Sequence, residues 1–69
     1  MKTEKSLLNV LLNNVIDFTT DLLELGYSLN DTLKYGLGFI YNQKERKGLS
    51  LEDYIELESK YLQRIIAIS

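Results

Sequence analysis

Apolar residues recur along this chain at intervals of three and four positions in three stretches, with polar residues between them. Placed at roughly 100° per residue, these intervals gather the apolar side chains on one face of a helix. The pattern predicts helices over residues 7–25, 29–46 and 51–68, and a Thr3 cap gives the first helix an alternative, earlier start. Residues 35–41 also alternate with period two, so a strand is the alternative there.

A short motif of the form Ser-Leu-x-Asn/Asp recurs every 22 residues, at Ser6, Ser28 and Ser50. Gly26 and Gly48 each stand two residues before the second and third copies. Serine followed three residues later by an acid is typical of a helix N-cap, and glycine is typical of a helix end. The motif therefore predicts that each helix begins after one of these serines and that the first two helices end at the glycines.

The connections between the predicted helices are short, which makes consecutive helices antiparallel neighbours. An up-down-up three-helix bundle is the simplest all-α fold that follows, with residues 1–69 as a single domain. The first helix carries apolar residues over about half of its circumference, which is wider than one neighbouring helix covers. A helical hairpin whose first helix docks on a second copy of the chain, forming a homodimer, therefore remains the alternative.

Superposition of the three segments on the 22-residue period predicts which positions form the core. Asn14, Gly36 and Glu58 are equivalent and non-apolar, and we expect them to form a polar layer near mid-helix. A carboxylate there is costly unless it is hydrogen-bonded, paired or protonated. Glu58 then either pairs with Asn14 or a lysine, turns toward solvent, or marks a partner-facing polar site. Three other equivalent positions are apolar in every copy and are the expected core layers: Leu7, Leu29 and Leu51; Leu11, Leu33 and Ile55; Phe18, Ile40 and Leu62.

Three further features of the second helix are candidate parts of a binding surface. Tyr35 and Phe39 form an i,i+4 aromatic pair on its flank, and aromatic residues are enriched at protein interfaces. Lys44 falls on its core side, where the stem can lie along apolar surface with the amine in water, or where the amine can pair with Glu58. Arg46 belongs to the basic cluster at its end, whose charge complements the helix dipole.

Composition and charge change this picture mainly by exclusion. The chain has neither Cys nor His, which removes disulfides and the common zinc and haem ligand sets. Neither a catalytic set nor a phosphate-binding loop is evident, so we expect no enzyme, no metal and no cofactor. The net charge of −2 argues against binding nucleic acid mainly through phosphates. No apolar run approaches the roughly 20 residues of a membrane span, and the polar N-terminus is unlike a secretion signal, so a cytoplasmic location is expected.

The favoured hypothesis for function is a small regulator, inhibitor or adaptor that binds another protein through its helix surfaces. The 69 residues carry more apolar and aromatic helix surface than they easily bury, which indicates a partner or self-association. We expect a homodimer or higher oligomer through the wide face of the first helix. A nucleic-acid-binding regulator and an antitoxin- or immunity-type inhibitor are the alternatives. The absence of Pro and the abundance of Leu, Ile, Asn, Lys and Tyr resemble short bacterial or phage reading frames.

Overall fold

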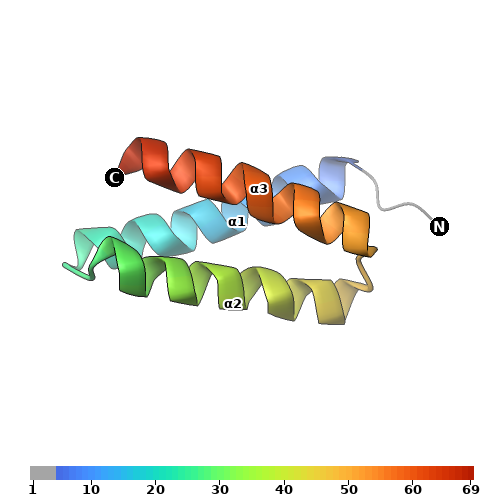
Figure 1. Ribbon diagram of the computed structural model, residues 1–69, viewed down its shortest axis with the longest axis horizontal. Coiled ribbons are helices and arrows are strands. Elements are labelled where there is room, and N and C mark those ends of the chain that lie inside the picture. Colours follow the sequence, from blue (N-terminus) through green and yellow to red (C-terminus); the bar gives the residue numbers. More distant parts are fainter. Residues whose placement is uncertain (1–4) are drawn as a thin grey trace.

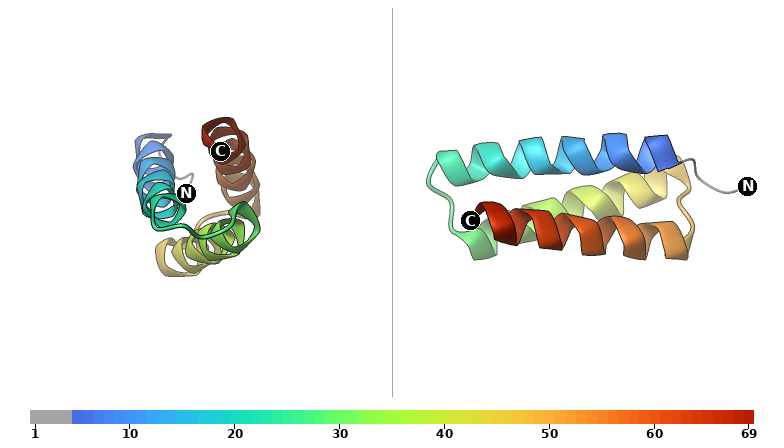
Figure 2. Two further views of the ribbon diagram at one scale, coloured as in Figure 1. Left: turned by 90° about the vertical axis from the view of Figure 1, so that its left-hand side faces the viewer. Right: turned by 90° about the horizontal axis from the view of Figure 1, so that it is seen from above.

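Three helices make up nearly all of the part of the chain that the computed structural model describes, residues 5–69 (Figure 1). They are α1 (Lys5–Glu24), α2 (Leu29–Lys47) and α3 (Leu51–Ile68). Both α1 and α3 run in the same direction, and α2 runs against them (Figure 2). The predicted up-down-up three-helix bundle is therefore confirmed, and the strand alternative in the second segment is wrong. The alternative start at Thr3 lies outside the described residues.

Side-chain caps begin α2 and α3 as the serine motif predicts. The Ser28 hydroxyl accepts a hydrogen bond from the backbone N–H of Asp31 at 3.1 Å, and the Ser50 hydroxyl accepts one from Asp53 at 3.1 Å. Each bond satisfies a backbone N–H that has no acceptor within the first helical turn. The first copy of the motif behaves differently, because α1 begins before Ser6 and includes it. The predicted start of the first helix after Ser6 is wrong.

Two glycines end α1 and α2 in the left-handed conformation that the sequence predicts. Gly26 has a φ of 99° and Gly48 a φ of 66°. Side chains disfavour this backbone region, so glycine is the residue suited to it. After Gly48, the N–H of Leu49 donates to the carbonyl of Lys44 at 3.1 Å. The Leu49 side chain is buried, and the α2–α3 connection is thus tied to the core.

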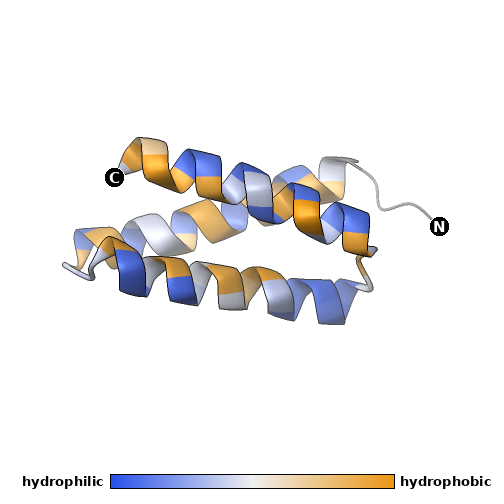
Figure 3. Cartoon of the chain, in the orientation of Figure 1, coloured by the Kyte–Doolittle hydropathy of each residue, from blue (hydrophilic) through white to orange (hydrophobic). Residues whose placement is uncertain are grey.

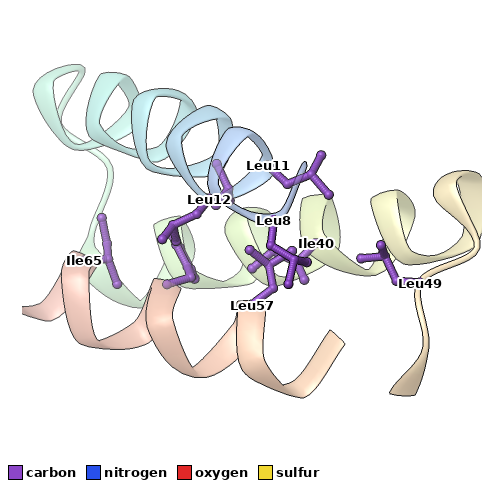
Figure 4. Packing of buried hydrophobic residues seen from close by; sticks show 9 residues of the cluster. Leu8, Leu11, Leu12, Ile40, Leu49, Leu57 and Ile65 are labelled. Atoms are coloured by element: carbon purple, nitrogen blue, oxygen red, sulfur yellow. The ribbon is translucent and has the colours of Figure 1, made fainter. Parts of the chain in front are cut away.

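The core lies along the axis between the three helices, and α1 contributes its largest share. Figure 4 shows buried side chains from all three helices converging there. Contacts of α1 with α2 and with α3 are more extensive than those between α2 and α3. Much of the wide apolar face of α1 is therefore covered within the chain, although Phe18 remains exposed. Figure 3 shows the C-terminal end of α2 as the most hydrophilic segment. The buried hydrophobic residues are Leu8, Leu11, Leu12, Val15, Ile40, Leu49, Leu57, Tyr61 and Ile65.

The expected core layers are partly wrong. Phe18, Leu51 and Ile55 are exposed, although the superposition places them in the core. Leu57, which belongs to none of the expected core layers, is buried instead. The reason is that α3 is rotated about its own axis relative to the expected orientation, so that Leu57 and Tyr61 point inward. The apolar residues on the other side of α3 consequently face solvent.

Candidate functional site

An exposed row of four aromatic side chains follows the contact between α1 and α2 near Gly26. Phe18 of α1 stacks on Phe39 of α2, with ring centroids 5.7 Å apart and ring planes at 29°. Tyr27, in the connection, packs edge-on against Tyr35 of α2, with centroids 6.0 Å apart and ring planes at 78°. Tyr35 and Phe39 are four residues apart on α2, so the two ring pairs are neighbours. We call these four residues the aromatic seam.

Most of the aromatic seam remains in contact with water. Tyr35 is 54% exposed, Phe18 and Tyr27 are also exposed, and Phe39 is half-buried beneath Phe18. The position of Tyr35 and Phe39 on the flank of the second helix is as the sequence predicts. Aromatic side chains gain free energy when they are removed from water, and offset or edge-on ring pairs add to it. The seam therefore has the composition of a protein-contact surface.

Asn14 and Arg46, two other sequence candidates, lie on the same side of the bundle. Arg46 follows Phe39 by seven residues and so shares its face of α2, while Asn14 precedes Phe18 by one turn of α1. Both side chains are exposed. Because α1 and α2 are antiparallel and meet at the Phe18–Phe39 pair, both lie beyond that pair, toward the C-terminal end of α2. The aromatic seam thus continues into a polar edge with one cation.

Lys44 lies on the opposite flank of α2, next to α3, and is half-buried. Its Nζ is 5.9 Å from the ring centroid of Tyr41 and 5.6 Å from that of Tyr54. These two rings meet edge-on, with centroids 6.4 Å apart. Aromatic rings attract a cation through their quadrupoles. Within the described part of the chain, Lys44 makes no ion pair with Glu58, and its nearest favourable contacts are these two rings.

The surroundings of these two rings raise the pKa of both phenols. Hydrogen bonding to Glu45, followed by the charge of that carboxylate, raises the pKa of Tyr41. Burial raises the pKa of Tyr54, and the charge of Glu58 and hydrogen bonding to it act in the same direction. Raising the pKa of a phenol disfavours phenolate formation. Both rings therefore stay uncharged beside Lys44, and their edge-on contact joins α2 to α3.

The polar layer expected from Asn14, Gly36 and Glu58 does not form. Asn14 is exposed, Glu58 is half-buried near Tyr54, and Gly36 is buried. Tyr61 of α3 fills the space over Gly36. A Cβ at position 36 would therefore overlap the phenol hydroxyl and the ring atoms next to it. The three positions are equivalent in sequence spacing but not in space, because each helix turns a different part of its circumference inward.

The hydroxyl of Tyr61 belongs to a group of buried hydroxyls that the sequence did not reveal. Tyr61, Thr19 and Thr32 are all fully buried. Thr19 Oγ1 donates to the carbonyl of Val15 at 2.7 Å, whereas Tyr61 Oη and Thr32 Oγ1 have no hydrogen-bond partner among the described residues. Burial raises the pKa of Tyr61, and the nearby Thr19 hydroxyl opposes part of that rise. This group is closed to solvent, so it acts on stability rather than on a ligand.

A second apolar surface lies along one side of α3 and consists of Leu51, Ile55, Leu62 and Ile66, which we call the α3 stripe. Leu51 is 66% exposed, Ile55 53% and Ile66 60%, while Leu62 is half-buried. The four positions follow the three- and four-residue intervals that place side chains on one helix face. The 22-residue superposition places Leu51, Ile55 and Leu62 in core layers, so this surface is identified by the structure and not by the sequence.

Comparisons of the chain with protein-family models, with curated proteins and with solved structures give no match. Over residues 5–69, no cluster of three or more His, Cys, Asp or Glu side chains could hold a metal ion. None of the helices in that range is long and apolar enough to cross a membrane. The aromatic seam and the α3 stripe are therefore the candidate binding surfaces.

Two residues of the aromatic seam, Phe18 and Tyr27, were not predicted from the sequence as parts of a binding surface. Phe18 falls within the apolar half of the first helix and was assigned to a core layer, and Tyr27 lies between helices, where helical periodicity gives no orientation. The available signal was the short connection itself. It places Tyr27 within reach of the first turns of the next helix and brings Phe18 opposite Phe39 in an antiparallel pair.

Proposed function

We propose that this chain is a small protein-binding module, acting as a regulator, inhibitor or adaptor, and that the aromatic seam is its contact surface. The observation that carries the proposal is the row of four rings at the α1–α2 contact, of which Phe18, Tyr27 and Tyr35 are exposed and Phe39 is half-buried. Tyr and Phe are typical of interface centres because they bury a large area while losing few rotatable bonds. Asn14 and Arg46 supply the polar edge that surrounds such centres.

The rings of the aromatic seam are held in position before any partner binds. Phe18 supports Phe39 from α1, and Tyr27 supports Tyr35 from the connection. All but Tyr27 lie on helices, so their backbone is already ordered. Ordering side chains and loops on binding opposes association, and a surface that is ordered beforehand avoids much of that cost. This preorganisation supports binding of a folded partner through the seam.

The test is an affinity pull-down that compares the wild type with two matched variants. Tyr35 and Tyr41 both lie on α2 and are 54% and 53% exposed, but they belong to opposite flanks. We expect a protein captured by the wild type to be retained by Tyr41→Ala and lost by Tyr35→Ala. Thermal unfolding followed by circular dichroism checks that both variants are folded. Equal capture by both variants, or loss only with Tyr41→Ala, would exclude the aromatic seam as the contact surface.

A direct binding measurement then separates the classes of partner. Once a protein is captured and purified, titration calorimetry with each variant should show at least a tenfold weaker affinity for Tyr35→Ala, as expected for an interface anchor that contributes about 1.4 kcal/mol or more. The identity of the captured protein distinguishes an adaptor from an inhibitor of the antitoxin or immunity type. Capture of nucleic acid without protein would instead support the nucleic-acid-binding alternative.

A further inference from the structure

The four positions of the α3 stripe are arranged symmetrically about their midpoint. Leu51 and Ile55 are four residues apart, and so are Leu62 and Ile66, so the spacing is the same in either direction. A helix that packs on an antiparallel copy of itself across a twofold axis places each position opposite its symmetric counterpart. Leu51 would then lie opposite the partner's Ile66, and Ile55 opposite the partner's Leu62.

We propose that the α3 stripe is the contact surface of a homodimer in which the two α3 helices pack antiparallel. This inference goes beyond the protein-binding function proposed for the aromatic seam and does not depend on it. On the broad apolar face of α1, Leu8, Leu12 and Val15 are buried within the chain, and the exposed Phe18 belongs to the aromatic seam. The α3 stripe is therefore the exposed aliphatic helix face on which a second copy of the chain can pack.

Polar residues along the edges of the stripe fit the same register. Glu52 and Gln63 lie on one edge, both exposed, and each would come within one helical turn of its counterpart on the other copy. Two symmetry-related, charge-assisted hydrogen bonds would result, in which the Gln63 amide N–H of each copy donates to the Glu52 carboxylate of the other, and they favour the antiparallel arrangement. On the other edge, Glu58 would approach the partner's Glu58 across the axis and oppose association. The favourable free energy of association therefore comes mainly from burial of the four apolar side chains at the centre.

The size of the stripe sets the expected strength of the dimer. The exposed parts of its four side chains amount to an apolar area on the order of 400 Å² per copy, against roughly 800 Å² per partner in a standard protein interface. Such an area is below the usual range of specific interfaces and is typical of weak, transient association. We therefore expect a dimer with a dissociation constant in the micromolar range or weaker, populated at high protein concentration.

Sedimentation equilibrium tests the proposed surface. We expect the wild type to shift from monomer to dimer between about 10 µM and about 1 mM, in line with the small interface, and Ile55→Glu to remain monomeric throughout. Val10→Glu is the matched control, because Val10 is also 53% exposed but lies on α1. Removal of the central like charges in Glu58→Gln should tighten the dimer several-fold. A wild type that stays monomeric over this range, or a control that breaks the dimer, overturns the proposal.

Disulfide crosslinking tests the register, and the chain suits it because it contains no cysteine. Single-cysteine variants Leu51→Cys and Ile66→Cys are incubated in a glutathione redox buffer, separately and mixed. A disulfide requires Cα atoms within about 7 Å of each other, so the antiparallel register predicts a crosslinked dimer in the mixture and little in either variant alone. Crosslinking of Leu51→Cys with itself indicates a parallel pair and overturns the proposed arrangement.

Discussion

Tyr61 of α3 occupies the volume that any side chain at position 36 of α2 would fill. Its hydroxyl and adjacent ring carbons lie directly over Gly36, and both residues are buried. Glycine inside a helix destabilises it by about 0.5–1 kcal/mol relative to alanine, and burial of a large aromatic side chain offsets this cost. The pair also fixes the rotation of α3, with Leu57 turned toward the core and the α3 stripe turned outward.

The two glycines inside α2 should respond to alanine in opposite directions. Gly36→Ala should destabilise the fold by about 1–3 kcal/mol, because the new methyl group overlaps the Tyr61 ring. Gly38→Ala should stabilise it by roughly 0.5–1 kcal/mol, because a Cβ at that position would meet no atom of the described residues within 4 Å beyond its chain neighbours and the backbone of its own helix. Urea unfolding followed by circular dichroism measures both. Equal effects at the two positions would contradict the packing described for Gly36 and Tyr61.

Replacing Thr32 with valine should stabilise the protein by about 1 kcal/mol, since it removes a buried hydroxyl that lacks a hydrogen-bond partner while keeping the shape of the side chain. Thr19→Val is the matched comparison, because Thr19 is equally buried but donates a hydrogen bond to the carbonyl of Val15 at 2.7 Å. That variant should be neutral or less stable. Thermal melts of the two variants, run in parallel, distinguish these outcomes.

Stability should fall at alkaline pH, and Tyr61 should contribute to the fall. Burial raises the pKa of Tyr61 above its ordinary value of 10.0. Below about pH 10 the phenol is protonated in both states. Above it, the unfolded chain loses this proton more readily than the folded one, so the free energy of unfolding decreases as pH rises. Unfolding free energies measured from neutral pH to pH 11 should show a shallower decrease for Tyr61→Phe than for the wild type.

The contact of Lys44 with two tyrosine rings should contribute measurably to stability. Lys44→Met keeps an unbranched apolar stem but removes the charge above Tyr41 and Tyr54, and we expect a loss of about 0.5–1 kcal/mol. Lys47→Met is the control, since both lysines lie in the last turn of α2 and experience the same helix dipole. Chemical unfolding of the two variants isolates the ring contact. If both lose the same amount, the dipole alone accounts for the effect.

The helix ends at the two connections were predictable because they depend on local chemistry. Ser28 and Ser50 cap the helices that follow them, and Gly26 and Gly48 adopt the left-handed conformation that ends a helix. Each of these roles involves residues that are at most a few positions apart. Sequence spacing alone therefore carries the information.

The orientation of α3 was not predictable in the same way. Leu51, Ile55 and Ile66 form a regular apolar row, and periodicity alone assigns such a row to the core. The observed orientation includes the packing of Tyr61 over Gly36, a contact between two different helices that periodicity along one helix does not describe. The aromatic seam also combines a predictable feature with one that was not. The flank position of Tyr35 follows from the periodicity of its own helix, whereas the stacking of Phe18 on Phe39 depends on how α1 packs on α2.

The unequal contacts among the three helices have a consequence for how the protein opens. Because α1 packs on both other helices while α2 and α3 touch each other less, separating α1 from the rest exposes nearly the whole core at once. Local openings that expose little of the core, such as fraying of the C-terminal end of α2, leave α1 in place. Amide protons in the middle of α1 should therefore exchange with solvent only when the entire molecule unfolds, and those near the end of α2 should exchange much earlier.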